Sequence, residues 1–208
     1  MIQYIIKSIF GEIQSRVTPV NPTTHHPLPY FSQFEPNWKR SGAVSKKEND
    51  YWSHNTCGMA CLKMILKYKQ NKALPIVTLA KKCTEYGGYI LTTDEALGLF
   101  YEPFCRFVKK EFNLNASVAP FLTMKRIMFE MSQGNFVIAS VSPEIRDRKN
   151  IPEKVTGGHL VLITGYDMGK KTISIHNPSG IPNKSQKDYV MTFNEFKTFF
   201  AGRGILVE

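Results

Sequence analysis

The sequence lacks an apolar run long enough to cross a membrane, which takes about 20 residues. Lys7 and Glu12 interrupt the apolar start of the chain, and no small-residue cleavage site of a secretory signal follows it. The 208 residues also contain no internal repeat and no low-complexity tract. We therefore expect one soluble domain with a short N-terminal extension, retained in the cytoplasm or exported without a classical signal peptide.

Cysteine is scarce, and the spacing of the four thiols matches no small disulfide scaffold; they are Cys57, Cys61, Cys83 and Cys105. We expect these thiols to be free. Basic residues outnumber acidic ones by 27 to 17, but no run of five or more basic residues occurs, and no signature of an RNA-recognition domain, zinc finger or helix-turn-helix is present. We expect these basic residues to be spread over the solvated surface or to favour acidic substrates. We expect no nucleic-acid partner.

The first 27 residues differ in pattern from the rest. Over residues 2–17 helical spacing relates Ile2, Ile5, Ile6, Ile9, Phe10 and Ile13. We expect an amphipathic helix that packs on the domain, with membrane attachment as the alternative. Residues 18–29 carry four prolines and no periodicity, which predicts an extended linker. We therefore divide the chain into a helix and Pro-rich linker, 1–27, and a main domain, 28–208.

Helices are expected first in the main domain, over residues 53–69, 75–86, 94–107 and 119–133. Short β-branched or apolar runs between turn signals then predict strands over residues 136–141, 159–164, 172–176, 189–192 and 204–207, with a short helix at 194–200. Helices followed by antiparallel strands are typical of an α+β fold.

Cys57 falls at the start of the helix predicted over 53–69, where Ser53, Asn55 or Thr56 can cap it. A thiol is nucleophilic as thiolate, and its pKa falls at a helix N-terminus beside an imidazolium. Gly58 lets the backbone approach a substrate carbonyl, so that the Cys57 amide can donate to a developing oxyanion. Cys57 is our candidate nucleophile.

His159 is the candidate base, because it begins an apolar strand directly after two glycines and can face a cleft there. Asn177 ends the next strand. If the two strands pair as a hairpin through a turn at 165–167, Asn177 returns beside His159 and can hold the imidazole in one tautomer. His176 is the rival base, although strand alternation turns it away from Asn177. Asp167 is the rival orienting residue.

Several runs of this sequence resemble C39-like peptidases of the papain-like superfamily. In order, over roughly residues 28 to 206, they are Pro29-Tyr-Phe-Ser-Gln33, Asn55-Thr-Cys-Gly-Met-Ala-Cys61, Gly158-His-Leu-Val-Leu-Ile-Thr-Gly-Tyr-Asp167, Ile175-His-Asn-Pro-Ser-Gly180 and Phe200-Ala-Gly-Arg-Gly-Ile205. The resemblance implies a papain-like fold in which Cys57, His159 and Asn177 are catalytic. It also implies that Gln33 is the second oxyanion donor, with residues 35–52 as an inserted loop.

The function expected from these residues is a cysteine peptidase or amide hydrolase that acts on peptides or proteins through a thioester, without a cofactor. A papain-like deamidase or acyltransferase, and an idle peptide-binding module, are the alternatives. A basic membrane or nucleic-acid binder is a further class. Metal binding by His54, Cys57 and Cys61 lacks a second ligand pair at standard spacing. Residues 1–27 can also be an inhibitory segment.

Overall fold

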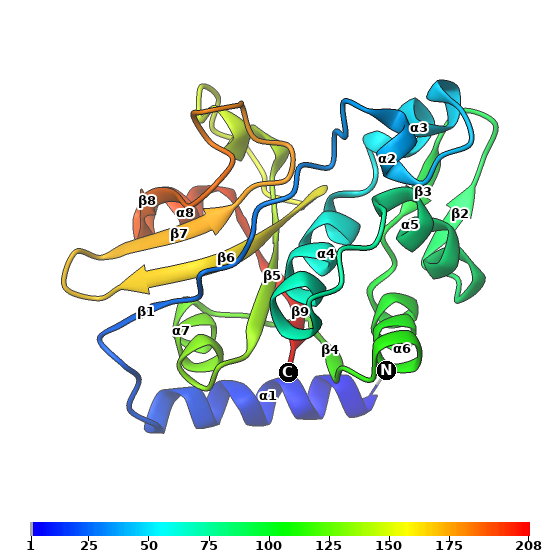
Figure 1. The fold of residues 1–208 in the computed structure, drawn as a ribbon. Coiled ribbons are helices and arrows are strands. Elements are labelled where there is room, and N and C mark those ends of the chain that lie inside the picture. Colours follow the sequence, from blue (N-terminus) through cyan, green and yellow to red (C-terminus); the bar gives the residue numbers. More distant parts are fainter. Residues whose placement is uncertain (1) are drawn as a thin grey trace.

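The computed structural model describes residues 2–208, and side chains from residue 5 onward. Helices and small strands fill the first half (Figure 1): α1 (Ile2–Val17), β1 (Thr23–His25), α2 (Trp38–Ser41), α3 (Lys46–Ser53), α4 (Cys57–Gln70), α5 (Ile76–Glu85), β2 (Tyr89–Leu91), β3 (Ala96–Gly98) and α6 (Tyr101–Phe112). The second half is mostly sheet: β4 (Ala116–Ala119), α7 (Met124–Ser132), β5 (Phe136–Val141), the 3-10 turn η1 (Pro143–Arg146), β6 (His159–Asp167), β7 (Thr172–His176), β8 (Tyr189–Thr192), α8 (Phe193–Phe199) and β9 (Phe200–Val207).

One antiparallel sheet organises the molecule, with strand order β4-β9-β5-β6-β7-β8 and β1 added beside the far end of β6. Strands β2 and β3 form a separate hairpin. Helices α4, α5 and α6 lie on one side of the main sheet, and α7 and α8 lie on the other (Figure 1). The expected α+β fold of papain-like type is confirmed.

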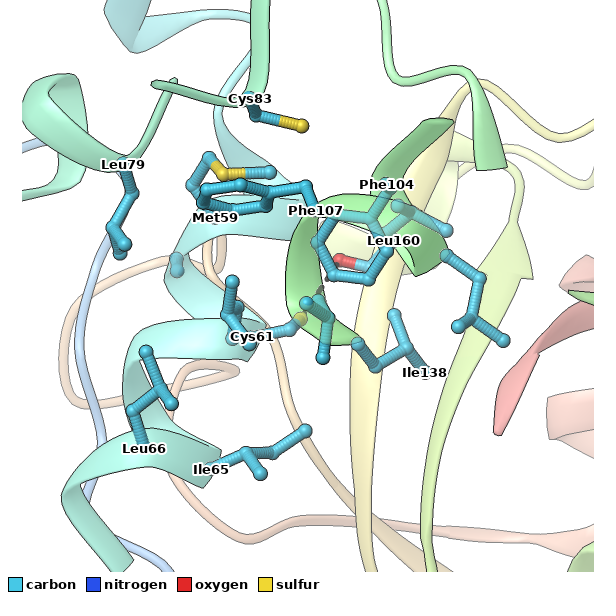
Figure 2. Packing of buried hydrophobic residues seen from close by; sticks show 14 of the residues in the cluster. Met59, Cys61, Ile65, Leu66, Leu79, Cys83, Phe104, Phe107, Ile138 and Leu160 are labelled. Atoms are coloured by element: carbon cyan, nitrogen blue, oxygen red, sulfur yellow. Dashed lines mark hydrogen bonds between the residues drawn. The ribbon is translucent and has the colours of Figure 1, made fainter. Parts of the chain in front are cut away.

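Strand alternation divides the core into two clusters. Ile138 and Leu160 point toward α4, whereas their neighbours Val137 and Val161 pack with α7 and α8. Figure 2 shows part of the first cluster, in which side chains of α4 lie among those of neighbouring helices and the sheet: Met59, Cys61, Ile65, Leu66, Leu79, Cys83, Phe104, Phe107, Ile138 and Leu160. Helix α4 is therefore a core helix, and its N-terminus is held rigidly.

The helix predicted over 53–69 begins later, at Cys57, as α4. Two further predicted helices also begin later than expected. The helix predicted over 94–107 placed Pro103 in its interior, where proline removes a hydrogen bond and clashes with the preceding turn. In the structure α6 begins at Tyr101, so Pro103 lies in its first turn, and residues 96–98 form β3 instead. Thr123 likewise caps α7 by accepting from the Arg126 amide, and the residues before it form β4. Both predictions were wrong at their starts.

The predicted loop 35–52 and linker 18–29 contain regular structure. Ser45 caps α3 by accepting from the Glu48 amide, and Thr23–His25 pair with Gly165–Asp167 as β1. The prolines flank β1 rather than interrupt it, which keeps its amide groups available for pairing. The residues at 165–167, predicted as a turn, are the end of β6.

Helix α1 forms where the periodicity predicts it, but it packs on the domain with its polar side. Gly11, Glu12 and Ser15 are buried, whereas the predicted apolar face is exposed to solvent: Ile5, Ile6, Ile9, Phe10 and Ile13. The side chain of Ile2 lies outside the described residues. The expectation that this apolar face packs on the domain was wrong. None of the helices described is long and apolar enough to span a membrane.

Candidate active site

Cys57 is the first residue of α4 and is half-buried. Thr56 precedes it without a side-chain capping bond, so the amides of the first turn stay available. Gly58 has a packing role that the sequence did not indicate: a Cβ there would lie 2.6 Å from Leu99 Cδ2 and 3.0 Å from Leu160 Cδ1. The absence of a side chain at 58 brings α4 close enough to β6 for Cys57 to reach the same cleft as His159.

His159 is the first residue of β6 and is only 6% exposed. Gly157 and Gly158 precede it with φ values of +89° and +106°, which L side chains rarely adopt, so the glycines let the chain turn sharply into the strand. His159 Nε2 lies 2.8 Å from Asn177 Oδ1. Since the amide oxygen can only accept, Nε2 carries a proton and donates it, which leaves Nδ1 as the basic nitrogen of the neutral ring.

Asn177 is fully buried and follows β7 directly. The β6–β7 hairpin pairs Leu162 with His176 and Ile163 with Ile175, so the hairpin assumed from the sequence is present and returns Asn177 to His159. Ser179 was missed by the sequence analysis. Its hydroxyl lies 3.1 Å from His159 Nε2, and its amide donates to Asn177 Oδ1 over 3.2 Å. The Asn-Pro-Ser-Gly turn was the available signal, because continuing the hairpin register brings 179 opposite 159.

Gln33 lies in a segment that holds the Asn177 turn. Tyr30 Oη donates to the Asn177 carbonyl over 3.0 Å, and the Gln33 amide donates to the Pro178 carbonyl over 3.0 Å. The Gln33 side chain is buried, and its Nε2 donates to the Ser53 carbonyl over 2.8 Å. Gln33 thus ties the Asn177 turn to the residues that lead into α4, and it is not among the residues that line the cleft beside Cys57.

A cleft of about 250 Å³ opens between α4 and the start of β6, lined by Cys57, Gly98, Leu99, Tyr101, Gly158, His159, Leu160 and Arg203. Arg203 comes from β9, and its Nη2 donates to the Thr156 carbonyl. The sequence analysis did not single out Arg203, nor Gly98, Leu99 and Tyr101, as cleft residues, although Arg203 lies inside one of the family-like runs, between two glycines.

Burial shifts both reactive groups toward their neutral forms. Loss of solvation raises the pKa of Cys57, and this effect exceeds the lowering by the backbone N–H groups of Leu160, Gly58 and Cys57 itself. Burial also lowers the pKa of His159 to about 4, against the bond from Asn177, which raises it. The sequence analysis expected a thiol pKa lowered at a helix N-terminus. That expectation was wrong, because desolvation outweighs the helix amides here.

The rival residues lie in other surroundings. His176 Nε2 contacts the Leu28 carbonyl and its Nδ1 accepts from the Asp188 amide, so both ring nitrogens are engaged in the core. Asp167 accepts from the Lys170 amide in the hairpin turn.

All four cysteines are free, and Cys61 is fully buried. Within the described part of the chain, no three His, Cys, Asp or Glu side chains are grouped to hold a metal ion.

Cys57 at a helix start and His159 on an antiparallel sheet line one cleft, in a fold of the papain-like class. The model of the Peptidase_C39 like family matches residues 25–204, and the chain belongs to that family. The comparison with curated protein sequences gives no match.

The solved structures that are similar in fold include the following two. One is that of a Bacillus anthracis protein described as a C39-like peptidase, with a TM-score of 0.60 at 15% identity, covering 89% of this chain and 97% of that one. The other is xylellain, a cysteine protease from Xylella fastidiosa, with a TM-score of 0.57 at 12% identity, covering 91% and 87% of the two chains. At these identities the likeness concerns the fold.

Proposed function

We propose that the protein is a cysteine peptidase that cleaves peptide bonds in peptide or protein substrates, with Cys57 as nucleophile, His159 as base and Asn177 as the orienting residue. The observation that carries this proposal is the bond of 2.8 Å between His159 Nε2 and Asn177 Oδ1, made by a histidine that lines one cleft with Cys57. Burial of a polar group costs hydration, which the bond to Asn177 offsets for His159, and titratable groups with shifted pKa values in a cleft are typical of functional sites.

The resting site contains a protonated thiol and a neutral imidazole, because burial raises the pKa of Cys57 and lowers that of His159. His159 then acts as a general base during the attack. As the Cys57 Sγ bonds to the substrate carbonyl carbon, the thiol proton passes to His159 Nδ1, and the carbonyl electron pair moves to oxygen. The bond from Asn177 stabilises the imidazolium that forms.

The oxyanion needs donors in the cleft, and the Cys57 amide at the first turn of α4 is the first one we assign. We assign Gln33 as the second. Its Nε2 donates to the carbonyls of Ser53, over 2.8 Å, and His54, over 3.4 Å, so the side chain has to give up the longer of these bonds to reach the oxyanion. Collapse of the tetrahedral intermediate expels the amine, which takes the proton from His159. Water, deprotonated in turn by His159, hydrolyses the thioester and releases the Cys57 thiol.

The test is digestion of a mixture of synthetic peptides, with the new peptide ends identified by mass spectrometry. We expect cleavage by the wild type and by Cys105→Ala, which removes a buried thiol on α6, and none by Cys57→Ser or His159→Ala. A wild type that leaves the peptides intact, or cleavage that survives Cys57→Ser, would contradict the proposal.

The same experiment separates the alternative outcomes of acylation. Deamidation converts glutamine or asparagine side chains to acids without new peptide ends, and acyl transfer joins a peptide to an added amine. We expect new ends as the dominant product. Dominance of either other product would keep Cys57 as nucleophile and replace the peptidase assignment.

A further inference from the structure

Helix α1 presents an apolar face to solvent, which we define as Ile5, Ile6, Ile9, Phe10, Ile13 and Val17. The exposed fractions of these side chains run from 37% at Ile5 to 77% at Val17. Residues 5, 9, 13 and 17 follow one another at four-residue spacing, and 6 and 10 lie beside them, so the six side chains form one continuous stripe. Contiguous apolar stripes on a protein surface, unlike single exposed apolar side chains, often mark interaction sites.

The domain cannot cover this stripe, because the opposite side of α1 is already bonded to it. Ser8 Oγ donates to the Phe121 carbonyl over 3.0 Å. Glu12 accepts from both the Thr123 amide, over 3.1 Å, and the Thr123 hydroxyl, over 2.8 Å. Gly11 leaves room for the Arg126 guanidinium, which a Cβ at that position would strike. These contacts hold α1 along the bottom edge of the molecule in Figure 1, with its apolar face outward.

We propose that the apolar face of α1 binds the surface of an anionic lipid bilayer, with the helix lying in the plane of the membrane. The charges agree with such a surface. Lys7 and Arg16 are exposed on α1 without an ion pair among the described residues, and Glu12, the only acidic residue of the helix, is bonded to Thr123. The whole chain carries a formal charge of +10. Anionic headgroups attract such basic residues, and the interface accepts apolar side chains.

The size of the stripe argues against a second copy of the chain as its partner. A helix of 16 residues is about 24 Å long and about 10 Å wide. Its face therefore offers roughly 240 Å², whereas a stable dimer interface takes about 800 Å² from each partner. A bilayer requires no complementary patch, so a single helix face is sufficient for reversible binding.

The experiment is co-sedimentation of the purified chain with phosphatidylcholine vesicles, with and without phosphatidylglycerol. We expect binding to the anionic vesicles that weakens as salt is raised. The triple variant I6Q/F10Q/I13Q should bind at least tenfold more weakly. The matched control V44Q/I151Q/V190Q removes three other exposed apolar side chains, and it should bind like the wild type. All six positions are solvent-exposed, so folding is preserved.

Two results would overturn the membrane proposal. One is equal binding by the two triple variants, which would place the contact elsewhere on the surface. The other is no binding to anionic vesicles. In that case a dimer in sedimentation velocity that I6Q/F10Q/I13Q abolishes would make a second copy the occupant.

A separate observation concerns Arg203, and this second inference depends on the proposed function. Arg203 lines the cleft with Cys57 and His159, its guanidinium donates to the Thr156 carbonyl, and among the described residues no carboxylate pairs with it. Gly157 makes room for it, since a Cβ there would lie 2.6 Å from Arg203 Nη2. His159 is neutral at pH 7, so Arg203 is the charged side chain of the cleft lining. We infer that Arg203 binds a carboxylate of the substrate beside the scissile bond, and that the protein prefers acidic peptides.

A pair of thiol reagents tests this preference without a known substrate. Iodoacetate is anionic and iodoacetamide neutral, and both alkylate Cys57 through the same thiolate, so the ratio of their rates reports the charge in the cleft. We expect Arg203→Gln to lower the ratio of iodoacetate to iodoacetamide by about fivefold. Arg203→Lys should retain most of it, and Arg16→Gln, which removes the same charge from α1, should leave it unchanged.

The outcomes distinguish failure of the role assigned to Arg203 from failure of the proposed peptidase function. An unchanged ratio in Arg203→Gln, with peptides still cleaved, overturns the role of Arg203 alone. A wild type in which Cys57 labels no faster than buried Cys83 and which cleaves no peptide overturns the proposed function and the preference with it.

Discussion

Helices α4 and α1 carry similar apolar patterns and end in opposite environments. In α4 the residues from Met59 to Leu66 are buried, and the helix is packed between the sheet and its neighbouring helices. In α1 the apolar residues face solvent, and a buried glutamate bonds the helix to the domain. The spacing of apolar residues therefore predicts a helix and which of its side chains form the apolar face. Whether this face turns to the core or to solvent depends on the polar contacts that the opposite face of the helix makes.

The largest expected effect lies at the start of α4. Cys57→Ser and His159→Ala should each lower kcat by at least about 10³-fold, because members of a nucleophile–base unit act together. The free energy of unfolding of Cys57→Ser should change little, since the side chain is half-buried and similar in size. Phe10→Ala on α1 should retain full activity. Peptide hydrolysis measures kcat, and urea unfolding measures the free energy of unfolding. An active Cys57→Ser would show that Cys57 is not the nucleophile.

Truncation of one apolar side chain should lower the free energy of unfolding much more in α4 than in α1. Leu62→Ala in α4 removes a fully buried side chain and should lower the free energy of unfolding by about 2–5 kcal/mol. Ile13→Ala in α1 removes a side chain that is 56% exposed and should change it by less than about 0.5 kcal/mol. A large loss for Ile13→Ala in urea unfolding would mean that the apolar face of α1 is covered in solution.

The pH dependence of stability should follow His159. Unfolded His159 takes up a proton near its ordinary pKa of 6.5, whereas burial lowers the native pKa to about 4. The unfolded state then binds more protons between these values, and the free energy of unfolding falls by about 3 kcal/mol as the pH drops from 6.5 to about 4.

Chemical unfolding across that pH range measures the contribution, and His159→Gln should remove it. Burial also lowers the pKa values of His26 and His176, so a smaller slope should remain in the variant. Ile13→Ala on α1 should keep the full slope of the wild type. An unchanged slope in His159→Gln would show that the native imidazole is not held neutral.

The smallest expected effect is on kcat, after removal of one hydroxyl near the active site, compared with removal of one hydroxyl on α1. Ser179→Ala removes the hydroxyl that lies 3.1 Å from His159 Nε2, and we expect about a three- to tenfold fall in kcat with KM unchanged, with a shifted acidic limb of the pH profile. Ser8→Ala removes the bond to the Phe121 carbonyl and should leave kcat as it is. An equal effect of the two substitutions would reduce Ser179 to a structural role.

Local patterns predicted those parts of the fold that depend on neighbours in the chain. The hairpin between His159 and Asn177 follows from two apolar runs with a short connection. The presence of a helix around Cys57 follows from the change of composition at Ser53, although α4 itself begins only at Cys57. The order of helices and antiparallel strands was also within reach.

Contacts between segments far apart in the chain could not be predicted from local sequence patterns. The three residues of β1 are a strand only because β5 ends beside Leu162 and leaves the end of β6 with a free edge on the side away from β7. Arg203 enters the cleft because β9 lies next to β5, which no local signal indicates. Gln33 is tied to Ser53 and Pro178 by bonds across the fold. The outward face of α1 depends on Thr123, more than a hundred residues away.

The protonated state of Cys57 also has a consequence for oxidation. Peroxides attack thiolates rather than thiols, so a thiol whose pKa is raised by burial reacts slowly with them. Cys61, the nearest other thiol along α4, is fully buried, and its pKa is raised further. We therefore expect the resting Cys57 to be oxidised by peroxide more slowly than a thiolate nucleophile would be, at the cost of part of its resting nucleophilicity.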